Sequence, residues 1–400
     1  MPNFHGTATH ELFVPLGGTM LADPYLVYER LRTEDPVHRH EQLAAWVVTR
    51  HDDCTYVLRR ADLFGSDPRA LGRTVPPEVL SLQTMDPPEH TAVRHSFLTA
   101  LRRRGDARWE EEVRRVAARA VRAMRAAGAA SGPVDLVEML AEPVALHAMC
   151  ALYGIRRADD ATMALFRTTS RTMVLGMDSG LDPTRREPAL RARTVLNRLL
   201  LGWRADAEPD GVLAEVSAGR DGDVDQVTLN SLRAVFDAGY STTANMIGNA
   251  LLHLLRRGPL TATVAESVDP NAVDELTRVD GVVQAISRHC LADTELRGIR
   301  LRHGDVVIVV LAAANHDPLV FSRPREFDPT RDPNPHLGFG RGVHSCLGSH
   351  FGRRVLCAVF AALGDALGDA PAGRVELAGP WTQRPTATQR GLDRLPVLVR

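Results

Sequence analysis

Apolar residues recur three and four positions apart along most of this chain, which is the spacing of helices that bury one face. The longest such stretch, residues 226–257, has an apolar residue at nearly every turn and stops at Gly258 and Pro259, which end helices. Asp223 or Asp225 can cap its start through a side-chain oxygen. We therefore predict one long helix that crosses the core.

The other helical patterns are shorter, and the strand patterns are few. Helices are predicted at residues 23–31, 54–58, 87–94, 109–153 with a break at 127–133, 158–175, 195–205 and 347–363. Strands are predicted at residues 37–38 and 45–48, which form a hairpin, and from residue 282 onward. Residues 65–82 and 176–188 contain Gly and Pro without clear periodicity and are predicted loops. This pattern predicts a mainly α fold with small β-sheets.

The composition sets outer bounds on the class of protein. A chain of 400 residues with 44% hydrophobic content can bury a large core, and its length alone suggests two or three domains. The formal net charge of −1 creates no overall field that would attract nucleic acid or an anionic membrane. We therefore expect no nucleic-acid partner.

The cysteines and the apolar runs indicate the compartment. Five cysteines, odd in number and scattered, speak against a disulfide framework and for a reducing environment. Residues 1–11 show no basic start followed by an apolar run, and no stretch of about 20 apolar residues occurs. We expect a cytoplasmic protein with no membrane association.

One cysteine stands in a stretch punctuated by glycine, residues 336–354, just before a helical pattern. Glycines at positions 338, 340, 342 and 348 let this stretch bend tightly and let a large planar group approach the backbone. Cys346 then lies at a helix N-terminus, where free backbone N–H groups and the helix dipole favour a thiolate over a thiol. A thiolate held in this way can be a nucleophile or a metal ligand.

Two other interpretations of Cys346 remain open at this point. A single cysteine is most often a small buried hydrophobe. His344, Cys346 and His350 could instead belong to a zinc site, although a structural zinc site usually takes four ligands and paired cysteines, which this stretch lacks.

Two further groups of residues are candidates for chemistry. His90 and Arg94 share one face of a predicted helix and can hold a carboxylate, although a solvated helix face has the same pattern. The centre of the long helix reads Ala238-Gly239-Tyr240-Ser241-Thr242-Thr243, where the glycine alone costs roughly 1 kcal/mol of helix stability. Such a cost favours a functional role, and packing of Ala238 and Gly239 against a neighbouring helix is the alternative.

The run Phe339-Gly340-x-Gly342-x-His344-x-Cys346-x-Gly348 resembles the haem-ligand signature of the cytochrome P450 family. The resemblance implies haem b, that is iron protoporphyrin IX, with Cys346 as the axial thiolate on the iron and Phe339 and Gly348 in the ligand loop. It assigns four basic residues to the haem propionates: His90, Arg94, Arg288 and His344. It also places Glu275, Arg278 and Arg331 in a buried ionic triad that holds the scaffold.

The resemblance gives the centre of the long helix a catalytic role. Ala238 and Gly239 would lie over the iron, and the hydroxyl of Thr242 would help to deliver protons to dioxygen. The family usually has an acid immediately before this threonine, whereas Ser241 stands here. Asp237 lies one turn earlier, but the motif does not assign it this role.

The resemblance covers nearly the whole chain and implies one large triangular domain, residues 1–400, of the cytochrome P450 fold. Within it, residues 65–84 and 163–188 would form the substrate-pocket loops or lid, residues 226–257 the oxygen-activating helix, and residues 336–354 the haem-ligand segment.

The implied activity is that of a monooxygenase that inserts one atom of O2 into a small-molecule substrate and tailors a secondary metabolite, as in antibiotic biosynthesis. No flavin or iron–sulfur domain is appended, so a separate ferredoxin and ferredoxin reductase would supply electrons. The expected docking patch for an acidic ferredoxin comprises Arg102, Arg103, Arg104, Arg353 and Arg354. Two alternatives stay open: an atypical member that performs oxidative coupling, desaturation or peroxide-dependent chemistry because of Ser241, and a non-catalytic haem sensor.

Overall fold

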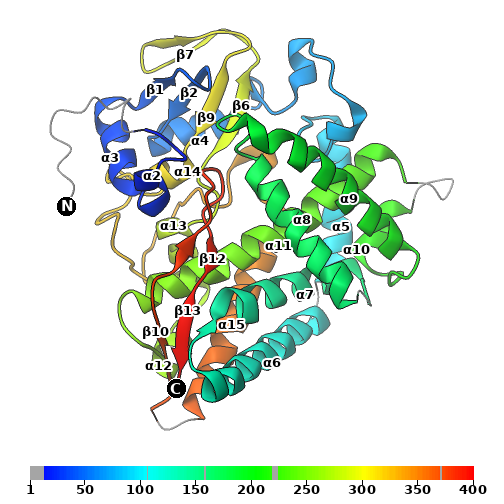
Figure 1. Cartoon of the computed structure of the whole chain (residues 1–400). Coiled ribbons are helices and arrows are strands. Elements are labelled where there is room, and N and C mark those ends of the chain that lie inside the picture. Colours follow the sequence, from blue (N-terminus) through cyan, green and yellow to red (C-terminus); the bar gives the residue numbers. More distant parts are fainter. Residues whose placement is uncertain (1–12, 106, 157–158, 219–223, 370–371) are drawn as a thin grey trace.

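The computed structural model describes residues 13–105, 107–156, 159–218, 224–369 and 372–400. Most of these residues lie in helices, and short strands form small sheets beside the helical body (Figure 1). The mainly α architecture with small sheets is therefore confirmed.

Helices form the larger part of the structure. The α-helices are α2 (Gly18–Ala22), α3 (Tyr25–Glu34), α4 (His51–Arg59), α5 (Glu89–Arg104), α6 (Ala107–Ser131), α7 (Glu142–Tyr153), α8 (Asp160–Gly176), α9 (Arg186–Arg204), α10 (Val212–Ser217), α11 (Gln226–Leu255), α12 (Ala262–Glu266), α13 (Pro270–Val279), α14 (Leu311–Ala314) and α15 (Ser349–Gly368). Short turns of other helix types are η1 (Pro68–Leu71), η2 (Pro77–Val79), η3 (Val137–Ala141), η4 (Pro183–Arg185) and η5 (Gly342–His344).

The strands form one larger sheet and three smaller ones. They are β1 (Val37–His40), β2 (Ala45–Val48), β3 (Phe64–Gly65), β4 (Val134–Asp135), β5 (Leu260–Thr261), β6 (Ile286–Cys290), β7 (Thr294–Leu296), β8 (Ile299–Leu301), β9 (Val306–Val309), β10 (Arg374–Leu377), β11 (Thr382–Gln383), β12 (Leu392–Arg394) and β13 (Pro396–Val399). The five-stranded sheet has the order β1-β2-β9-β6-β3, in which only β2 and β9 run parallel. The four-stranded sheet has the order β4-β13-β10-β5.

The central helix α11 passes through the main hydrophobic core, where it packs against α7 and α15. Asp225 caps its start by accepting a hydrogen bond from the backbone N–H of Thr228 at 2.9 Å. Phe236 of α11 meets the ring of Tyr153 from α7 at 4.8 Å and that of Phe166 from α8 at 5.0 Å. The helix predicted at residues 226–257 is confirmed, and its aromatic contacts show that α7 and α8 cover its middle.

Several predicted boundaries are wrong. α6 continues to Ser131 through residues 127–130, because the alanines there favour a helix. α9 begins at Arg186, nine residues before the prediction, since its first turn carries few apolar residues to mark it. The strand expected from residue 282 begins at Ile286. Residue 158, the predicted first residue of a helix, and Asp223, one of the two predicted capping residues, lie outside the described residues.

Within the described ranges, none of the helices combines the length and the apolar character that a membrane crossing requires.

Candidate functional site

The loop that precedes α15 is bent tightly around Cys346. The backbone N–H of Cys346 donates to the carbonyl of Phe339 at 2.8 Å, and Gly340 and Gly342 have φ of 67° and 75°, which side chains rarely adopt. A Cβ at Gly342 would lie 2.1 Å from the carbonyl oxygen of Leu58 in α4. The glycines therefore allow the loop to turn and to lie directly against α4.

Cys346 differs from the other cysteines in its surroundings. Its side chain is exposed, whereas Cys54, Cys150 and Cys290 are buried and Cys357 is half-buried. The loop presents its sulfur for a ligand to reach, as a buried structural cysteine would not.

We expected the protein around Cys346 to favour the thiolate over the thiol. This expectation is wrong for the side chain without a bound metal ion. Although solvent reaches the side chain, the protein packed around it removes hydration and raises the pKa of Cys346. The backbone N–H groups of Gly348 and Ser349 and the guanidinium groups of Arg94 and Arg353 lower this pKa, but by less. A metal ion bound to the sulfur would add the positive charge that a thiolate needs.

Basic side chains gather beside the loop from three separate segments. His90 and Arg94 come from α5, Arg288 from β6, and His344 from η5. The rings of His90 and His344 are 4.3 Å apart, and a guanidinium nitrogen of Arg94 lies 3.5 Å from the hydroxyl of Ser345. Three of the sequence-predicted residues are therefore neighbours, and within the described ranges Arg288 is linked to them through its electrostatic interaction with Asp86.

These basic groups have too few acidic partners. Asp86 accepts a hydrogen bond from Nε2 of His344 at 2.8 Å, and it also accepts from the backbone N–H groups of Ser66 and Asp67. His90 is buried, and its Nδ1 has no hydrogen-bond partner among the described residues. Burial and the nearby cations lower the pKa of His90 to about 4. The uncompensated positive charge of the site is therefore that of Arg94 and Arg288, which have no hydrogen-bonded carboxylate in the described structure, and it fits a bound group that carries carboxylates.

The centre of α11 is less enclosed than the residues beside it. Ala238, Gly239, Thr242 and Thr243 are half-buried, whereas the flanking Asp237, Tyr240, Ser241 and Ala244 are buried. The hydroxyl of Thr242 donates to the carbonyl of Ala238 at 2.7 Å, and α11 keeps its α-helical form throughout. A half-buried polar patch inside the longest helix can face a substrate or a cofactor.

Close packing against α7 explains why a glycine stands at position 239. A Cβ there would lie 2.4 Å from the sulfur of Met149 in α7, so even alanine would displace that side chain. This contact supports the packing interpretation for Gly239.

Sequence reasoning missed the partner of Asp237. Its carboxylate accepts a hydrogen bond of 2.5 Å from the hydroxyl of Ser170 in α8, and burial raises the pKa of Asp237 to about 6. Ser241 lies four residues later and therefore on the same face of α11. No local pattern around Ser170 indicates this contact, because it joins residues 67 positions apart.

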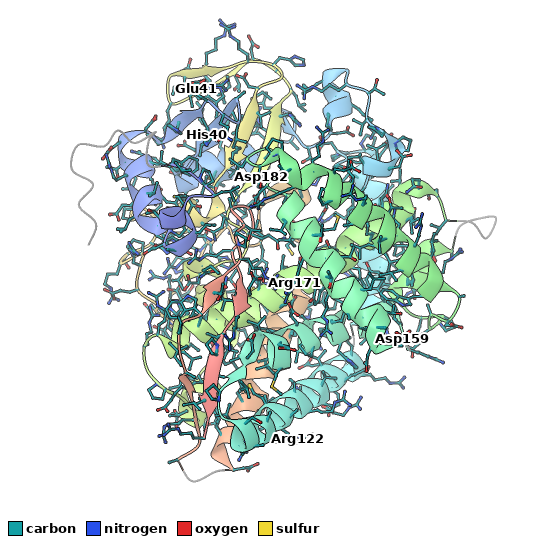
Figure 2. All side chains as sticks on the ribbon, in the orientation of Figure 1. His40, Glu41, Arg122, Asp159, Arg171 and Asp182 are labelled. Carbon is teal, nitrogen blue, oxygen red and sulfur yellow. The ribbon has the colours of Figure 1, made fainter. Side chains whose placement is uncertain are left out.

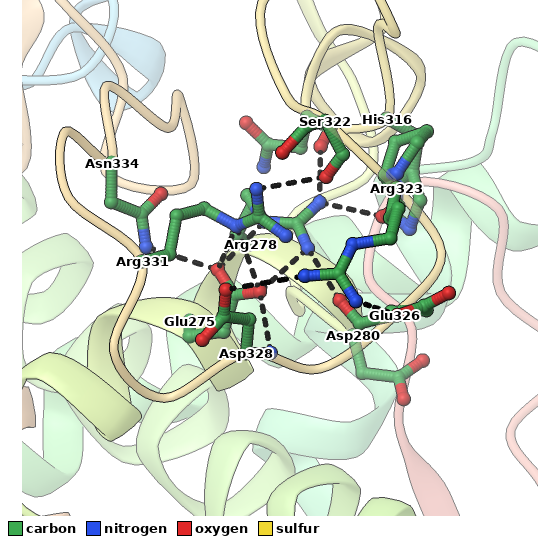
Figure 3. A network of polar contacts seen from close by, with 12 residues as sticks. Glu275, Arg278, Asp280, His316, Ser322, Arg323, Glu326, Asp328, Arg331 and Asn334 are labelled. Atoms are coloured by element: carbon green, nitrogen blue, oxygen red, sulfur yellow. Dashed lines mark hydrogen bonds and ion pairs between the residues drawn. The ribbon is translucent and has the colours of Figure 1, made fainter.

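The predicted ionic triad is formed on the side of α13 (Figure 3). Glu275 and Arg278 are fully buried, and the guanidinium of Arg278 donates to both carboxylate oxygens of Glu275 at 2.7 and 2.8 Å. Arg331 donates to the same carboxylate at 3.1 Å, as does Asn334. Arg278 also donates to the carbonyls of Asn315, Pro324 and Glu326. The triad ties the segment before the cysteine loop to α13.

The expected lid, residues 163–188, consists of most of α8, a short connection and the start of α9. In the connection, Asp178 accepts hydrogen bonds from the backbone N–H groups of Ala387 and Thr388 at 2.8 and 3.0 Å. Arg171 of α8, near the centre of the face in Figure 2, donates to Glu142 at the start of α7 at 2.7 Å. These contacts, together with that between Ser170 and Asp237, anchor this segment to the rest of the protein.

Most of the arginines expected to form a docking patch already have acidic partners. Arg104 pairs with Glu208 and Asp210, Arg354 with Glu110, and Arg353 with Asp274. Arg103 lies 3.6 Å from Glu215. Arg102 is exposed and pairs with no acidic side chain in the described part of the chain. The docking role of the five arginines stays a prediction, and the structure shows that four of them already lie beside carboxylates.

The zinc interpretation finds no support in the described ranges, since they contain no group of three or more His, Cys, Asp or Glu side chains arranged to hold a metal ion. A single accessible cysteine, with an excess of cations beside it and a polar patch on the central helix, instead fits a metal cofactor that carries carboxylates. Haem has both features, so the residues gathered here fit a haem-binding site.

Comparisons with known proteins agree. Residues 270–363 match the family model described as "Cytochrome P450". The chain is 31% identical to 20-oxo-5-O-mycaminosyltylactone 23-monooxygenase of Streptomyces fradiae, over 96% of this chain and 91% of the relative. It is also 31% identical to cytochrome P450 105A3 of Streptomyces carbophilus, over 92% of each chain. Among solved structures, the cytochrome P450 PksS of Bacillus subtilis 168 matches with a TM-score of 0.81 and 25% identity, over 97% of this chain and 99% of that one.

The chain belongs to the cytochrome P450 family. It has the cytochrome P450 fold, its cofactor is haem b, and it is a monooxygenase that uses a small-molecule substrate and redox partners.

Proposed function

We propose that this monooxygenase inserts one oxygen atom from O2 into a small organic compound of secondary metabolism, as in the tailoring of an antibiotic. The observation that carries the reaction is the half-buried patch on α11, where Thr242 presents a hydroxyl beside Ala238. The relative from Streptomyces fradiae is named for oxidation of such an elaborated compound, which supports the substrate class.

Haem, when bound, supplies the binding and activation of dioxygen. We assign the sulfur of Cys346 as the iron ligand, and Phe339 and Gly348 as the residues that shape the ligand loop. The propionates would be held by the four basic residues His90, Arg94, Arg288 and His344, of which Arg94 and Arg288 have no hydrogen-bonded carboxylate in the described structure. The substrate would lie against the half-buried side of α11, with residues 65–84 and 163–188 as the other walls.

Thr242, Ser241 and Asp237 would control protons. The hydroxyl of Thr242 donates to the carbonyl of Ala238, and it can turn to donate a hydrogen bond to a group on its open side. Ser241 cannot hold a charge near neutral pH, so it can only pass a proton on. The carboxyl of Asp237, with a pKa of about 6, can store one on the same face of the helix.

Electrons would come from a ferredoxin and its ferredoxin reductase. Arg102 is the exposed cation of the expected docking patch without an acidic partner in the described structure, so it is the best single candidate for contact with an acidic ferredoxin.

A second candidate is an atypical reaction of the same site, such as oxidative coupling, desaturation or the use of peroxide. Ser241 in place of an acid is the observation that favours it. A non-catalytic haem sensor has weaker support, because the Thr242 hydroxyl and the patch around it are present.

The assignment of Cys346 is tested by the variant Cys346→His, with Cys357→Ser as a matched control on α15. The imidazole variant should keep some haem but lose the absorption spectrum of a thiolate-ligated, reduced, carbon-monoxide-bound haem, because imidazole donates less electron density. Cys357→Ser should keep that spectrum. A parent-like spectrum in Cys346→His would show that another residue is the ligand.

A further inference from the structure

A buried arginine on α11 has no hydrogen-bond or ion-pair partner in the part of the chain that the structure describes. Arg233 is 5% exposed and forms no hydrogen bond or ion pair with any residue that the structure describes. Its Nε is enclosed by protein. An uncompensated guanidinium is strongly unfavourable in such a position, and buried charges are normally paired and hydrogen-bonded. Arg233 therefore has an unmet requirement for an anion.

A second guanidinium lies close to the first. Arg193 of α9 is half-buried, and its Nε likewise has no partner within the described ranges. Burial, and then repulsion by Arg193, lower the pKa of Arg233 to about 10. Since burial also lowers the pKa of Arg193, the two groups share a poorly hydrated environment.

The nearest opposite charge does not neutralise this pair. Asp237 lies one turn after Arg233 on α11, and no ion pair within 4.0 Å joins the two in the described structure. Its carboxylate instead accepts a hydrogen bond from Ser170. Two guanidinium groups and one carboxylate leave net positive charge inside the protein.

The contacts of Asn230, a neighbour of Arg233 on α11, show where the arginine pair lies in the fold. One turn before Arg233, Asn230 donates to the carbonyls of Pro77 and Leu80 and accepts from Asn197 of α9. Arg233 thus follows the point where α11 meets residues 65–84, one of the proposed pocket walls, and α9.

The arginine pair and the oxygen-activating patch lie on different sides of α11. At a rise of about 1.5 Å and about 3.6 residues per turn, Arg233 lies roughly 7.5 Å along the helix axis from Ala238 and roughly 13.5 Å from Thr242, which is on the opposite side of the helix. Arg233 shares its own side with Asp237, one turn later.

We propose that Arg233 and Arg193 bind an anionic oxygen group of the substrate, a carboxylate or a phosphate ester. This inference rests on the proposed function of the site. The planar guanidinium fork matches both anions by paired hydrogen bonds, and exclusion of water strengthens the contact. Protonation of Asp237 would remove the one competing carboxylate and strengthen anion binding.

The test compares probes that differ only in the head group: dodecanoate, dodecyl phosphate and methyl dodecanoate. Their dissociation constants are measured by calorimetry on the haem-loaded parent, on Arg233→Met and Arg193→Gln, and on the control Arg198→Gln, an exposed arginine of α9. At least one anionic probe should bind the parent about ten- to a hundredfold more tightly than the ester. Arg233→Met should abolish this preference without weakening the ester, Arg193→Gln should reduce it, and Arg198→Gln should keep it. If the parent binds dodecanoate more tightly than dodecyl phosphate, the site takes a carboxylate, and the reverse order indicates a phosphate ester.

A second measurement separates binding from a structural role. Because Arg233 has no internal partner, Arg233→Met should leave the melting temperature of the ligand-free protein unchanged or raise it. A lower melting temperature, or equal binding of all three probes by the parent, would overturn the proposal. Failure of the monooxygenase assignment would appear separately, as a parent protein without the thiolate-type carbon monoxide spectrum.

Discussion

The carboxylate of Asp237 accepts a hydrogen bond from the hydroxyl of Ser170, and this contact joins the central helix α11 to α8. It lies one residue before the half-buried patch that begins at Ala238. Burial raises the pKa of Asp237 to about 6, while the Ser170 hydrogen bond and Arg233 lower it by less. The titratable carboxyl of Asp237 therefore lies directly before the proposed oxygen-activating patch and one turn after Arg233.

The stability of the protein should depend on the ionisation of Asp237. A free aspartate titrates near 3.8 and Asp237 near 6, so the folded state binds the extra proton between these pH values. The free energy of unfolding must then fall as the pH rises through that window, by at most about 2 to 3 kcal/mol. Asp237→Asn should flatten this dependence in urea unfolding, whereas Asp160→Asn, an exposed carboxyl on α8, should not. The same slope in Asp237→Asn and the parent would contradict the assignment.

Haem retention should depend on the cations beside the cysteine loop. Arg94→Ala and Arg288→Ala each remove a charge-assisted contact to a propionate, which is worth about 1.5 to 3 kcal/mol. Each variant should therefore lose haem at lower denaturant concentration, followed by absorbance, with Arg198→Ala as the control. If both variants keep haem as well as the parent does, these two arginines hold something else.

Proton delivery should depend mainly on Thr242, because Ser241 cannot act as a proton reservoir. Thr242→Ala should raise the hydrogen peroxide released per electron pair more than it weakens substrate binding. Ser241→Asp should improve coupling or leave it unchanged. Peroxide and product are measured together at saturating substrate. Unchanged coupling in Thr242→Ala would favour the atypical reaction, or a substrate that supplies the hydroxyl itself.

Docking of an acidic ferredoxin should depend more on Arg102 than on its paired neighbours. Arg102→Glu should slow electron transfer and weaken its salt dependence, because the attraction is screened over about 8 Å at physiological ionic strength. Arg354→Glu is the informative comparison, since it breaks an existing pair with Glu110 and should also lower stability. An unchanged salt dependence in Arg102→Glu would place the docking surface elsewhere.

Local patterns were enough to predict the long central helix, the hairpin of β1 and β2 and the glycine-bent cysteine loop. Helical periodicity and the positive φ of Gly340 and Gly342 depend on neighbouring residues in the chain. The family resemblance likewise rested on a continuous run of residues around Cys346, so the proposal that Cys346 binds the iron requires no knowledge of the fold.

Contacts between distant segments could not be predicted in this way. The pKa of Cys346, the pairing of Arg354 with Glu110 and the contact of Gly239 with Met149 each depend on which surfaces meet after folding. The same holds for Arg233, which reads as an ordinary helix residue until α9 and α11 enclose it. Burial and charge compensation are sums over all neighbours in space, whereas the periodicity and turn chemistry that predicted the helices act along the chain.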